Sequence, residues 1–414
     1  MRQRSRLISL MEGFKQSVLN IGTLGHIDHG KTSLVRALTN VWTDRHSESL
    51  KRNMTIKLGY ADTIIRKCEK CNGPEAYTTG DKCGECGGEA KPVMRISILD
   101  APGHETLMAT AIAGANIINA ILFVIAANEP CPMQQTREHL MVINLLGVKD
   151  TIIIQSKVDI VGKEAALAHY KQIKDFIKGS VIENAPIIPV MTNQGINVDV
   201  LLEMITKLPV PKHDPNADPF MYIARSFDVN KPGARIGSLK GGVIGGTLVR
   251  GMLKRGDEIE IRPGMKSSAH KREVYKPIIT KVDAISNGTE ELVEAGPGGL
   301  IGLSTEMDPS ITKADGLVGN VVGRRGKLPE VVSSMGMTYN TLNRKDIPER
   351  SFADNEPVIL SVGTLTVVGY VVQAKKNVLK LELRHPICAE KGIKIAVMRS
   401  VAQRWRLTGY GIMA

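Results

Sequence analysis

Four cysteines stand in two close pairs, and this spacing is the first feature of the sequence that suggests chemistry. Cys68 and Cys71 form one C-x-x-C pair, and Cys83 and Cys86 form the second after eleven intervening residues. Two such pairs on facing turns place four thiolates in a tetrahedron, the arrangement that Zn²⁺ favours. A Cys₄ set leaves no coordination position open for a substrate, so we expect a structural zinc site. Unpaired core cysteines are the alternative, which this spacing disfavours.

The segment from Gly25 to Thr32 suggests a second kind of chemistry, the binding of phosphate. It reads GHIDHGKT and fits the pattern G-x-x-x-x-G-K-[ST], between the strand-like run LNIGTL and the helix-like run KTSLVRAL. The glycines allow backbone N–H groups to surround phosphates, Lys31 adds a positive charge, and the Thr32 hydroxyl can ligate Mg²⁺. The residues expected to hold the nucleotide here are Asp28, His29, Gly30, Lys31, Thr32 and Ser33.

Two later segments complete a nucleotide site. DAPGH follows a strand-like run and places the Asp100 carboxylate where the metal ion is expected, with the Gly103 N–H able to reach the γ-phosphate. Ser156-Lys157-Val158-Asp159 follows another such run, where guanine-binding proteins carry Asn-Lys-x-Asp. The Asp159 carboxylate can accept from two guanine N–H groups, which adenine cannot reciprocate. The sequence therefore favours GTP and GDP over adenine nucleotides.

The guanine-binding segments depart from the usual pattern at two places. Ser156 stands where Asn is usual, and Met191-Thr192-Asn193 stands where Ser-Ala-x is common. A backbone N–H of Thr192 or Asn193 can still meet guanine O6, because that contact needs no particular side chain. GTP remains the expected ligand, and an altered affinity is left open.

The order of apolar and helix-like runs indicates the elements that position these motifs. Strand-like runs alternate with helical stretches from Val18 to about Leu208, which predicts a parallel-rich sheet of about five or six strands covered on both faces. The proline-rich segment LPVPKHDPNADPF interrupts both kinds of element, and glycine-punctuated strands follow it. We predict an α/β P-loop GTPase domain followed by two antiparallel β-barrels. The predicted boundaries are a basic N-terminal arm at 1–17, a G domain at 18–208 with a zinc ribbon at 66–90, a linker at 209–219, and barrels at 220–326 and 327–414.

The composition sets broader limits. The 414 residues exceed the size of one core, and the net charge of +12 suits a polyanionic partner or, alternatively, simple solubility. No apolar run approaches the roughly 20 residues that cross a bilayer. The cysteine pattern fits a reducing compartment, so we expect a soluble, cytoplasmic protein. The basic N-terminus reads as a frayed arm, and an organelle transit peptide is the weaker alternative.

The strings GHIDHGKTSL and DAPGHE resemble the translational GTPases, the group that contains elongation factor Tu. Within that group, further blocks resemble one family, the gamma subunits of initiation factor two, in a form that looks archaeal. The resemblance runs from about Val18 to the C-terminus. The blocks that carry it are WTDRHSESLKRNMTIKLGYAD, AANEPCPMQQTREHL, RSFDVNKPG, LKGGVIGG, ADGLVGNVVG and RWRLTGYG.

This resemblance implies a GTPase that carries initiator methionyl-tRNA to the small ribosomal subunit and releases it after hydrolysis. It implies alpha and beta subunits as partners in a heterotrimer and a separate activating partner for hydrolysis. It also implies that Thr55 closes on Mg²⁺ and the γ-phosphate, and that His104 orients the attacking water. A second Mg²⁺ near Asp28 and the carbonyl of Asn53 is implied as well, although Asn53 stands where the family usually has Gly.

Two other functions remain open from the sequence. An elongation factor for selenocysteine-tRNA or aminoacyl-tRNA shares the phosphate loop and the barrels, but the Cys₄ insertion and the KRNMTIKLG block argue against it. A zinc-ribbon RNA-binding module that binds nucleotide without hydrolysis is suggested by Ser156 and the Met191 segment. Retention of the expected phosphate, metal and water-orienting residues argues against that module.

Overall fold

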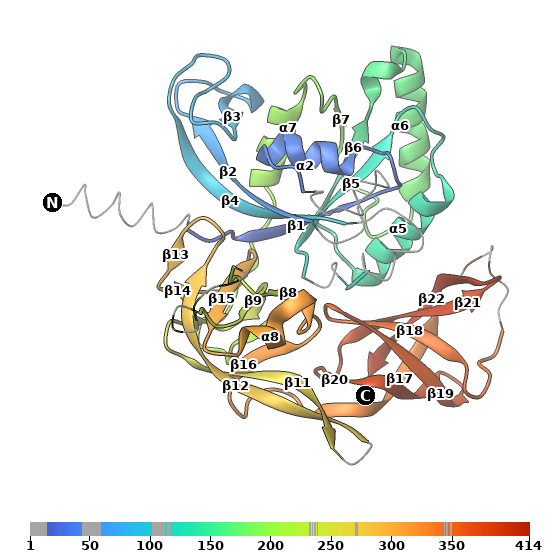
Figure 1. The fold of residues 1–414 in the computed structure, drawn as a ribbon. Coiled ribbons are helices and arrows are strands. Elements are labelled where there is room, and N and C mark those ends of the chain that lie inside the picture. The colour runs from blue at the N-terminus through green and yellow to red at the C-terminus, as the bar shows by residue number, and fades with distance from the viewer. Residues whose placement is uncertain are drawn as a thin grey trace. The chain divides into compact units, whose positions relative to one another are not determined.

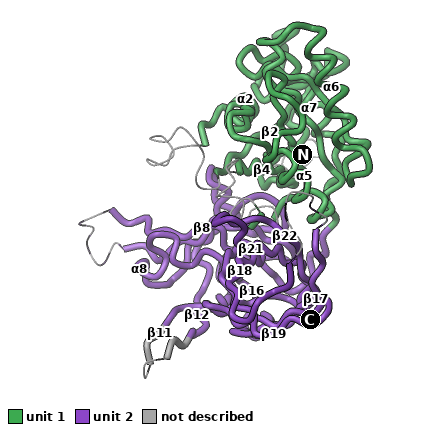
Figure 2. Tube along the Cα trace, turned by 90° about the vertical axis from the view of Figure 1, so that its right-hand side faces the viewer, with its two compact units in different colours: residues 1–212 green, residues 213–414 purple. Residues whose placement is uncertain are grey.

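The fold is described from a computed structural model, which divides into two compact units at residues 1–212 and 213–414 (Figure 2). The structure describes residues 15–43, 59–101, 112–113, 117–231, 233, 235, 237, 239–269, 272–342, 344, 347 and 350–414.

Unit 1 is built on one seven-stranded sheet with the order β3-β2-β4-β1-β5-β6-β7 (Figure 1). The five strands from β4 to β7 along this order are parallel, whereas β2 and β3 run antiparallel to their neighbours. The parallel-rich sheet is confirmed, but the expectation of five or six strands was too low, because β2 and β3 extend one edge. The strands are β1 (Leu19–Leu24), β2 (Gly59–Cys68), β3 (Tyr77–Thr78), β4 (Ala90–Asp100), β5 (Ala120–Ala126), β6 (Thr151–Ser156) and β7 (Ile187–Val190).

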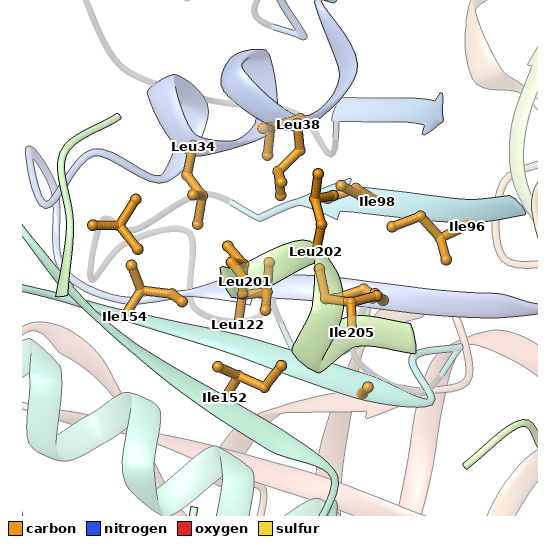
Figure 3. Packing of buried hydrophobic residues seen from close by; sticks show 14 of the residues in the cluster. Leu34, Leu38, Ile96, Ile98, Leu122, Ile152, Ile154, Leu201, Leu202 and Ile205 are labelled. Atoms are coloured by element: carbon orange, nitrogen blue, oxygen red, sulfur yellow. The ribbon is translucent and has the colours of Figure 1, made fainter. Parts of the chain in front are cut away.

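Helices cover both faces of this sheet, which is why its central strands are continuous apolar runs. Every residue of β1, β5 and β6 is buried. On one face, side chains of α2 and α7 pack on Ile154 of β6 and its neighbours (Figure 3). The next residue, Gln155, points the other way and donates from Nε2 to the Ala166 carbonyl of α6 at 2.8 Å. The α-helices of this unit are α2 (Lys31–Thr39), α5 (Gln134–Leu146), α6 (Lys163–Ile177) and α7 (Val198–Thr206).

The cysteine-containing segment lies between two strands of an antiparallel pair. Strand β2 pairs with β4 from Gly59 opposite Asp100 to Cys68 opposite Ala90. The short helix η1 (Pro74–Ala76) and β3 follow β2 before the chain returns along β4. The ribbon is therefore carried at the far end of the β2–β4 pair from Asp100.

Unit 2 contains two antiparallel barrels, as the sequence predicts. In the first, the order β11-β16-β8-β9-β15-β12 closes through pairing of β11 with β12, and β13 extends it. The second is closed in the order β17-β20-β19-β18-β21-β22. The strands of the first barrel are β8 (Phe220–Phe227), β9 (Val243–Arg250), β11 (Glu258–Ala269), β12 (Arg272–Ser286), β13 (Glu291–Leu292), β15 (Ile301–Thr305) and β16 (Val321–Arg324). Those of the second are β17 (Val331–Thr341), β18 (Pro357–Val362), β19 (Leu365–Lys375), β20 (Val378–Cys388), β21 (Lys394–Val401) and β22 (Arg404–Met413). The remaining short elements of the unit are β10 (Leu253–Lys254), β14 (Glu294–Ala295), α8 (Pro309–Thr312) and η5 (Lys313–Asp315).

Specific contacts join the two barrels within unit 2. The Arg250 guanidinium donates from Nη1 and Nη2 to the Glu390 carboxylate at 2.9 and 2.7 Å, and it lies 4.8 Å from the centre of the Phe220 ring. The Thr364 hydroxyl donates to the Ile223 carbonyl at 2.9 Å. Because the Arg250 guanidinium makes two hydrogen bonds to one carboxylate and lies over an aromatic ring, it fixes the orientation of the two barrels as well as the distance between them.

Candidate nucleotide site and metal centre

The segments expected to bind nucleotide follow the carboxyl ends of four parallel strands. The phosphate loop follows β1, Asp100 ends β4, Ser156 ends β6, and the Met191 segment follows β7. Carboxyl ends of parallel strands meet at one edge of the sheet, and ligands of such sheets bind at that edge. The topology thus brings together the segments that the sequence singled out separately.

The phosphate loop rests directly on β5. Gly25 has φ 145°, and a Cβ at this position would lie 2.2 Å from the Val124 carbonyl oxygen, so only glycine fits. The ring of His29 is buried, and its Nδ1 donates to the same carbonyl at 3.1 Å. Gly30 is the N-cap of α2 with φ 89° and supplies no side-chain cap, and the first turn, which contains half-buried Ser33, has no acidic residue. The positive end of α2 is therefore not neutralised by its own residues, as an anion site requires.

Lys31 is held inside this loop. Its Nζ donates to the carbonyl oxygens of Gly25 at 2.9 Å and His26 at 2.7 Å. Burial lowers the pKa of Lys31 to about 8, although the carboxylates of Asp100 and Asp28 oppose the shift. The loop thus holds the ammonium in place where the expected phosphates would meet it.

Asp100 collects three threonine hydroxyls. It accepts from Thr32 at 2.7 Å, from Thr43 at 2.8 Å and from Thr23 at 3.0 Å. Burial raises the pKa of Asp100, and these hydrogen bonds and Lys31 oppose the rise. A carboxylate beside the Thr32 hydroxyl offers the oxygen donors that Mg²⁺ prefers, so these residues fit the expected metal.

The expected second Mg²⁺ has only one of its two residues in the described structure. Asp28 is exposed, with φ 61°. Asn53 lies outside the described residues, as do Thr55, Gly103 and His104. Their assigned roles stay predictions.

The residues expected to contact guanine follow β6 and β7. The buried Ser156 hydroxyl donates to the His29 carbonyl at 2.6 Å, so it ties the end of β6 to the phosphate loop. Lys157 is half-buried with φ 56°, and Asp159 is exposed in the short helix η3 (Val158–Ile160). The neighbouring loop begins at Met191, whose N–H donates to the Ile196 carbonyl at 3.2 Å.

Thr192 is half-buried and Asn193 is exposed in this loop. Strands β6 and β7 pair in register, with Ser156 opposite Val190. The residues that follow each strand are therefore neighbours, which suits contact with one base.

Sequence reasoning missed Glu129 and two of the threonines. Glu129 Oε2 lies 3.1 Å from His29 Nε2 and pairs with the ring when the imidazole is protonated. Burial lowers the pKa of His29, while Glu129 opposes the shift. The sequence signal that could have identified Glu129 is its place as an acidic residue soon after the buried strand β5. No such signal marks Thr23 and Thr43, because their partner Asp100 is far away in the sequence.

The four ribbon cysteines form a compact cluster. All four Sγ atoms lie within 4.8 Å of one another, with Cys68 and Cys86 3.5 Å apart and Cys71 and Cys83 3.7 Å apart. Tetrahedral Zn²⁺ with Zn–S bonds of about 2.3 Å places sulfurs about 3.8 Å apart, so the donors fit zinc. The backbone N–H of Lys70 helps to lower the pKa of the Cys68 thiol to about 7, whereas the hydrogen bond to Cys86 and burial raise the pKa of the Cys71 thiol to about 12.

Three family models match the chain. The elongation factor Tu GTP-binding domain matches residues 16–210, elongation factor Tu domain 2 matches 241–322, and the C-terminal domain of initiation factor eIF2 gamma matches 333–413. Translation initiation factor 2 subunit gamma of Methanococcus maripaludis strain S2 is 50% identical over 409 residues, which are 97% of this chain and 100% of that protein. The chain belongs to the family of translation initiation factor 2 gamma subunits.

As a member of the translational GTPases, the chain is a GTPase, which confirms the predicted family and enzyme class. Other relatives are similarly close. The gamma subunit of Methanocaldococcus jannaschii is 48% identical over 96% of this chain and 97% of that protein. That of Pyrococcus horikoshii is 49% identical over 96% and 98%.

Solved structures share the fold of this gamma-subunit family member. A bacterial selenocysteine-specific elongation factor, EF-Sec, matches with a TM-score of 0.73 and 23% identity, over 96% of this chain and 58% of that chain. Elongation factor SelB from Methanococcus maripaludis, in complex with the GTP analogue GppNHp, matches with a TM-score of 0.71 and 22% identity, over 97% and 79%. In the described part of the chain, no helix is long and apolar enough to cross a membrane.

Proposed function

We propose that this GTPase carries initiator methionyl-tRNA to the small ribosomal subunit when GTP is bound and releases it after hydrolysis. The observation that supports this most directly is the phosphate loop. Lys31 and the Asp100 carboxylate lie inside a site at the carboxyl edge of the sheet, in a chain half identical to gamma subunits over almost its whole length. The family name further suggests partner subunits, which we take to be alpha and beta subunits in the cytoplasm.

The chain's own residues divide the work in this proposal. The backbone of the loop and Lys31 bind the phosphates, and the hydroxyl of Thr32 and the carboxylate of Asp100 hold the metal. Mg²⁺, when bound, offsets the charge that develops during phosphoryl transfer. Asp159 and the backbone after Met191 select guanine. Thr55 closes on the γ-phosphate, and His104 orients the water that attacks it.

The tRNA preference is tested by direct binding. Initiator and elongator methionyl-tRNA are each titrated into the protein with a nonhydrolysable GTP analogue or with GDP, in the presence of the partner subunits. We expect the tightest binding for initiator methionyl-tRNA with the GTP analogue. Equal affinity for both tRNAs in the presence of the analogue would instead favour an elongation-type carrier.

The role of His104 is tested by His104→Ala. We expect the stimulated hydrolysis rate to fall by roughly 10²-fold or more, the usual loss for a positioned acid, base or water-orienting group. GTP-dependent tRNA binding should change little, because other residues hold the ground state. Hydrolysis at the unmodified rate, with the activating partner and ribosome present, would show that His104 does not position the water.

A further inference from the structure

We propose that the cysteine ribbon positions the guanine-binding loop through helix α7, with Tyr77 as the positioning residue. Metal binding at the four cysteines and GDP binding at the sheet edge are then coupled, although the two sites occupy opposite ends of the β2–β4 pair. This inference rests on the proposed function, since it places guanine at the Met191 loop.

Helix α7 is covered on more than one side. From Asn197 to Thr206 every residue is buried or half-buried. Helix α6 differs, because most of its residues from Lys163 to Asp175 are exposed. A helix on a sheet normally leaves one face in solvent, as α6 does. The additional cover on α7 comes from the ribbon, whose helix η1 and strand β3 lie against it (Figure 1).

Tyr77 is the side chain that the ribbon and the G domain share. It packs in the small ribbon core with Cys68, Ala76 and Cys83. It also packs against the large core under α7, which contains the buried Leu201, Leu202 and Ile205. The Lys67 ammonium lies 5.0 Å from the centre of the Tyr77 ring and belongs to the strand that ends at Cys68. The ring of Tyr77 is thus held by the residues that hold the metal site.

Helix α7 also closes the guanine-binding loop. The loop runs from Met191 to Ile196, which form an isolated β-bridge, and α7 starts directly after Asn197. Asn197 Nδ2 donates to the Pro189 carbonyl of β7 at 2.8 Å, and the Asn197 carbonyl accepts from Leu201 N at 3.1 Å. One end of the loop is fixed by β7, and the other end is fixed by α7.

A single rigid helix therefore contacts the ribbon along its side and holds the loop at its start. When the cysteines are metal-bound, Tyr77 keeps α7 pressed on the sheet, and the N–H groups of Thr192 and Asn193 stay in place for guanine O6. When the metal leaves, the ribbon core loses its ligand-held structure and α7 loses that support. Binding at one site then strengthens binding at the other by the same factor, as linkage requires.

The experiment measures this factor in both directions on the full chain. The affinity for GDP is measured by calorimetry with and without zinc, and the affinity for zinc is measured by equilibrium competition with a chromophoric chelator, with and without GDP. We expect zinc removal to weaken GDP binding by about tenfold, and GDP to strengthen zinc retention by the same factor, a size typical of coupled sites.

Variants separate positioning from general stability. Tyr77→Ala should retain one equivalent of zinc, bind GDP more weakly and lose the reciprocal effect, whereas Tyr77→Phe should preserve all three properties. Tyr170→Ala, at an exposed tyrosine on α6, is the matched control and should change none of them. The same GDP affinity with and without zinc, or full coupling in Tyr77→Ala, would overturn the inference even if GDP binds well. Failure of the unmodified, zinc-loaded protein to bind GDP would overturn the proposed guanine site itself.

Discussion

The hydroxyl of Ser156 reaches from the end of β6 to the carbonyl of His29, and this contact gives a small side chain a precise role. The sequence pattern has Asn at this position in other guanine-binding proteins, where its amide would bond the purine. In this chain the Ser156 hydroxyl is buried and donates a hydrogen bond of 2.6 Å to the His29 carbonyl in the phosphate loop. The serine that departs from the pattern thus links the end of β6, where guanine contacts are expected, to the phosphate loop.

Ser156→Ala should weaken binding of both GDP and GTP by roughly fivefold, since a net hydrogen bond contributes about 1 kcal/mol. The fold should remain intact because the change is small and buried. Ser361→Ala is the matched control: this serine is equally buried in the second barrel, and its hydroxyl has no hydrogen-bond partner among the described residues. If calorimetry finds equal nucleotide affinity for the Ser156 variant and the control, the Ser156–His29 hydrogen bond does not contribute to nucleotide binding.

Asp159 carries the proposed guanine selectivity. Asp159→Asn should lower GDP affinity by roughly 10- to 100-fold, the range for losing hydrogen bonds to a charged group. Affinity for xanthosine diphosphate should rise, because an amide can donate to the oxygen that xanthine has in place of the guanine amine. Asp159 is exposed in η3, so the melting temperature should hardly change. Equal competition by ATP and GTP in the unmodified protein would contradict the assignment.

The elements that could be predicted from sequence are those with a local signal. The fully apolar run Ala120–Ala126 predicts a buried parallel strand, and all of β5 is buried. In β20, Leu379, Leu381 and Leu383 alternate with exposed residues, as their spacing predicts for a barrel. The Cys₄ spacing likewise predicts a cluster that the structure brings within 4.8 Å.

Elements and contacts set by distant parts of the chain could not be predicted. Strand β3 has two residues and exists only through its pairing with β2. Thr43 reaches Asp100 across 57 positions, and Glu129 reaches His29 across 100. Neither pair has a fixed spacing that a motif could capture. The additional cover of α7 by the ribbon is also invisible in its sequence, since η1 and β3 are too short to show periodicity.

We expect the structure of the ribbon to depend on its bound metal. Cys83→Ser should lower zinc content to less than about half an equivalent and loosen the ribbon without unfolding the G domain, because a Cys₄ site needs all four thiolates. Cys131→Ser, at a half-buried cysteine outside the cluster, should keep one equivalent. Elemental analysis of purified protein measures both. Less than about half an equivalent in the unmodified protein would argue against a structural zinc site.

Within unit 2 the two barrels meet at points where no side chain fits. Gly363, in the turn between β18 and β19, has φ 56°, and a Cβ there would lie 2.3 Å from a ring carbon of Tyr222 in the first barrel. Gly319, next to β16, would place a Cβ 2.4 Å from a methyl carbon of Leu365 in the second barrel. Each barrel thus has a glycine pressed against the other barrel.

Gly363→Ala should therefore destabilise unit 2 more than an alanine substitution at another glycine of positive φ that has no close neighbour. Gly392→Ala is the matched control in the second barrel, since Gly392 has φ 80° and a Cβ there meets nothing within 4 Å. The control should cost about 1 kcal/mol of unfolding free energy, and Gly363→Ala about 1–3 kcal/mol more, from overpacking against Tyr222. Equal melting temperatures for the two variants would mean that the barrels do not meet at Gly363.

The edges of the G-domain sheet have a further consequence, for self-association. An unpaired strand edge is a template on which a second molecule can add its own strand. One edge of this sheet is β3, which has two residues and pairs with only Arg66 and Lys67 of β2, and the other edge is β7, which carries Pro189. The rest of β2 has no strand partner on the β3 side among the described residues. Proline offers no N–H to an incoming strand, and the Pro189 carbonyl already accepts from Asn197. Both barrels close their own sheets. The asparagine that anchors α7 thus also shields β7, so we expect an Asn197 substitution to expose a backbone acceptor on this edge strand and to favour strand pairing between molecules.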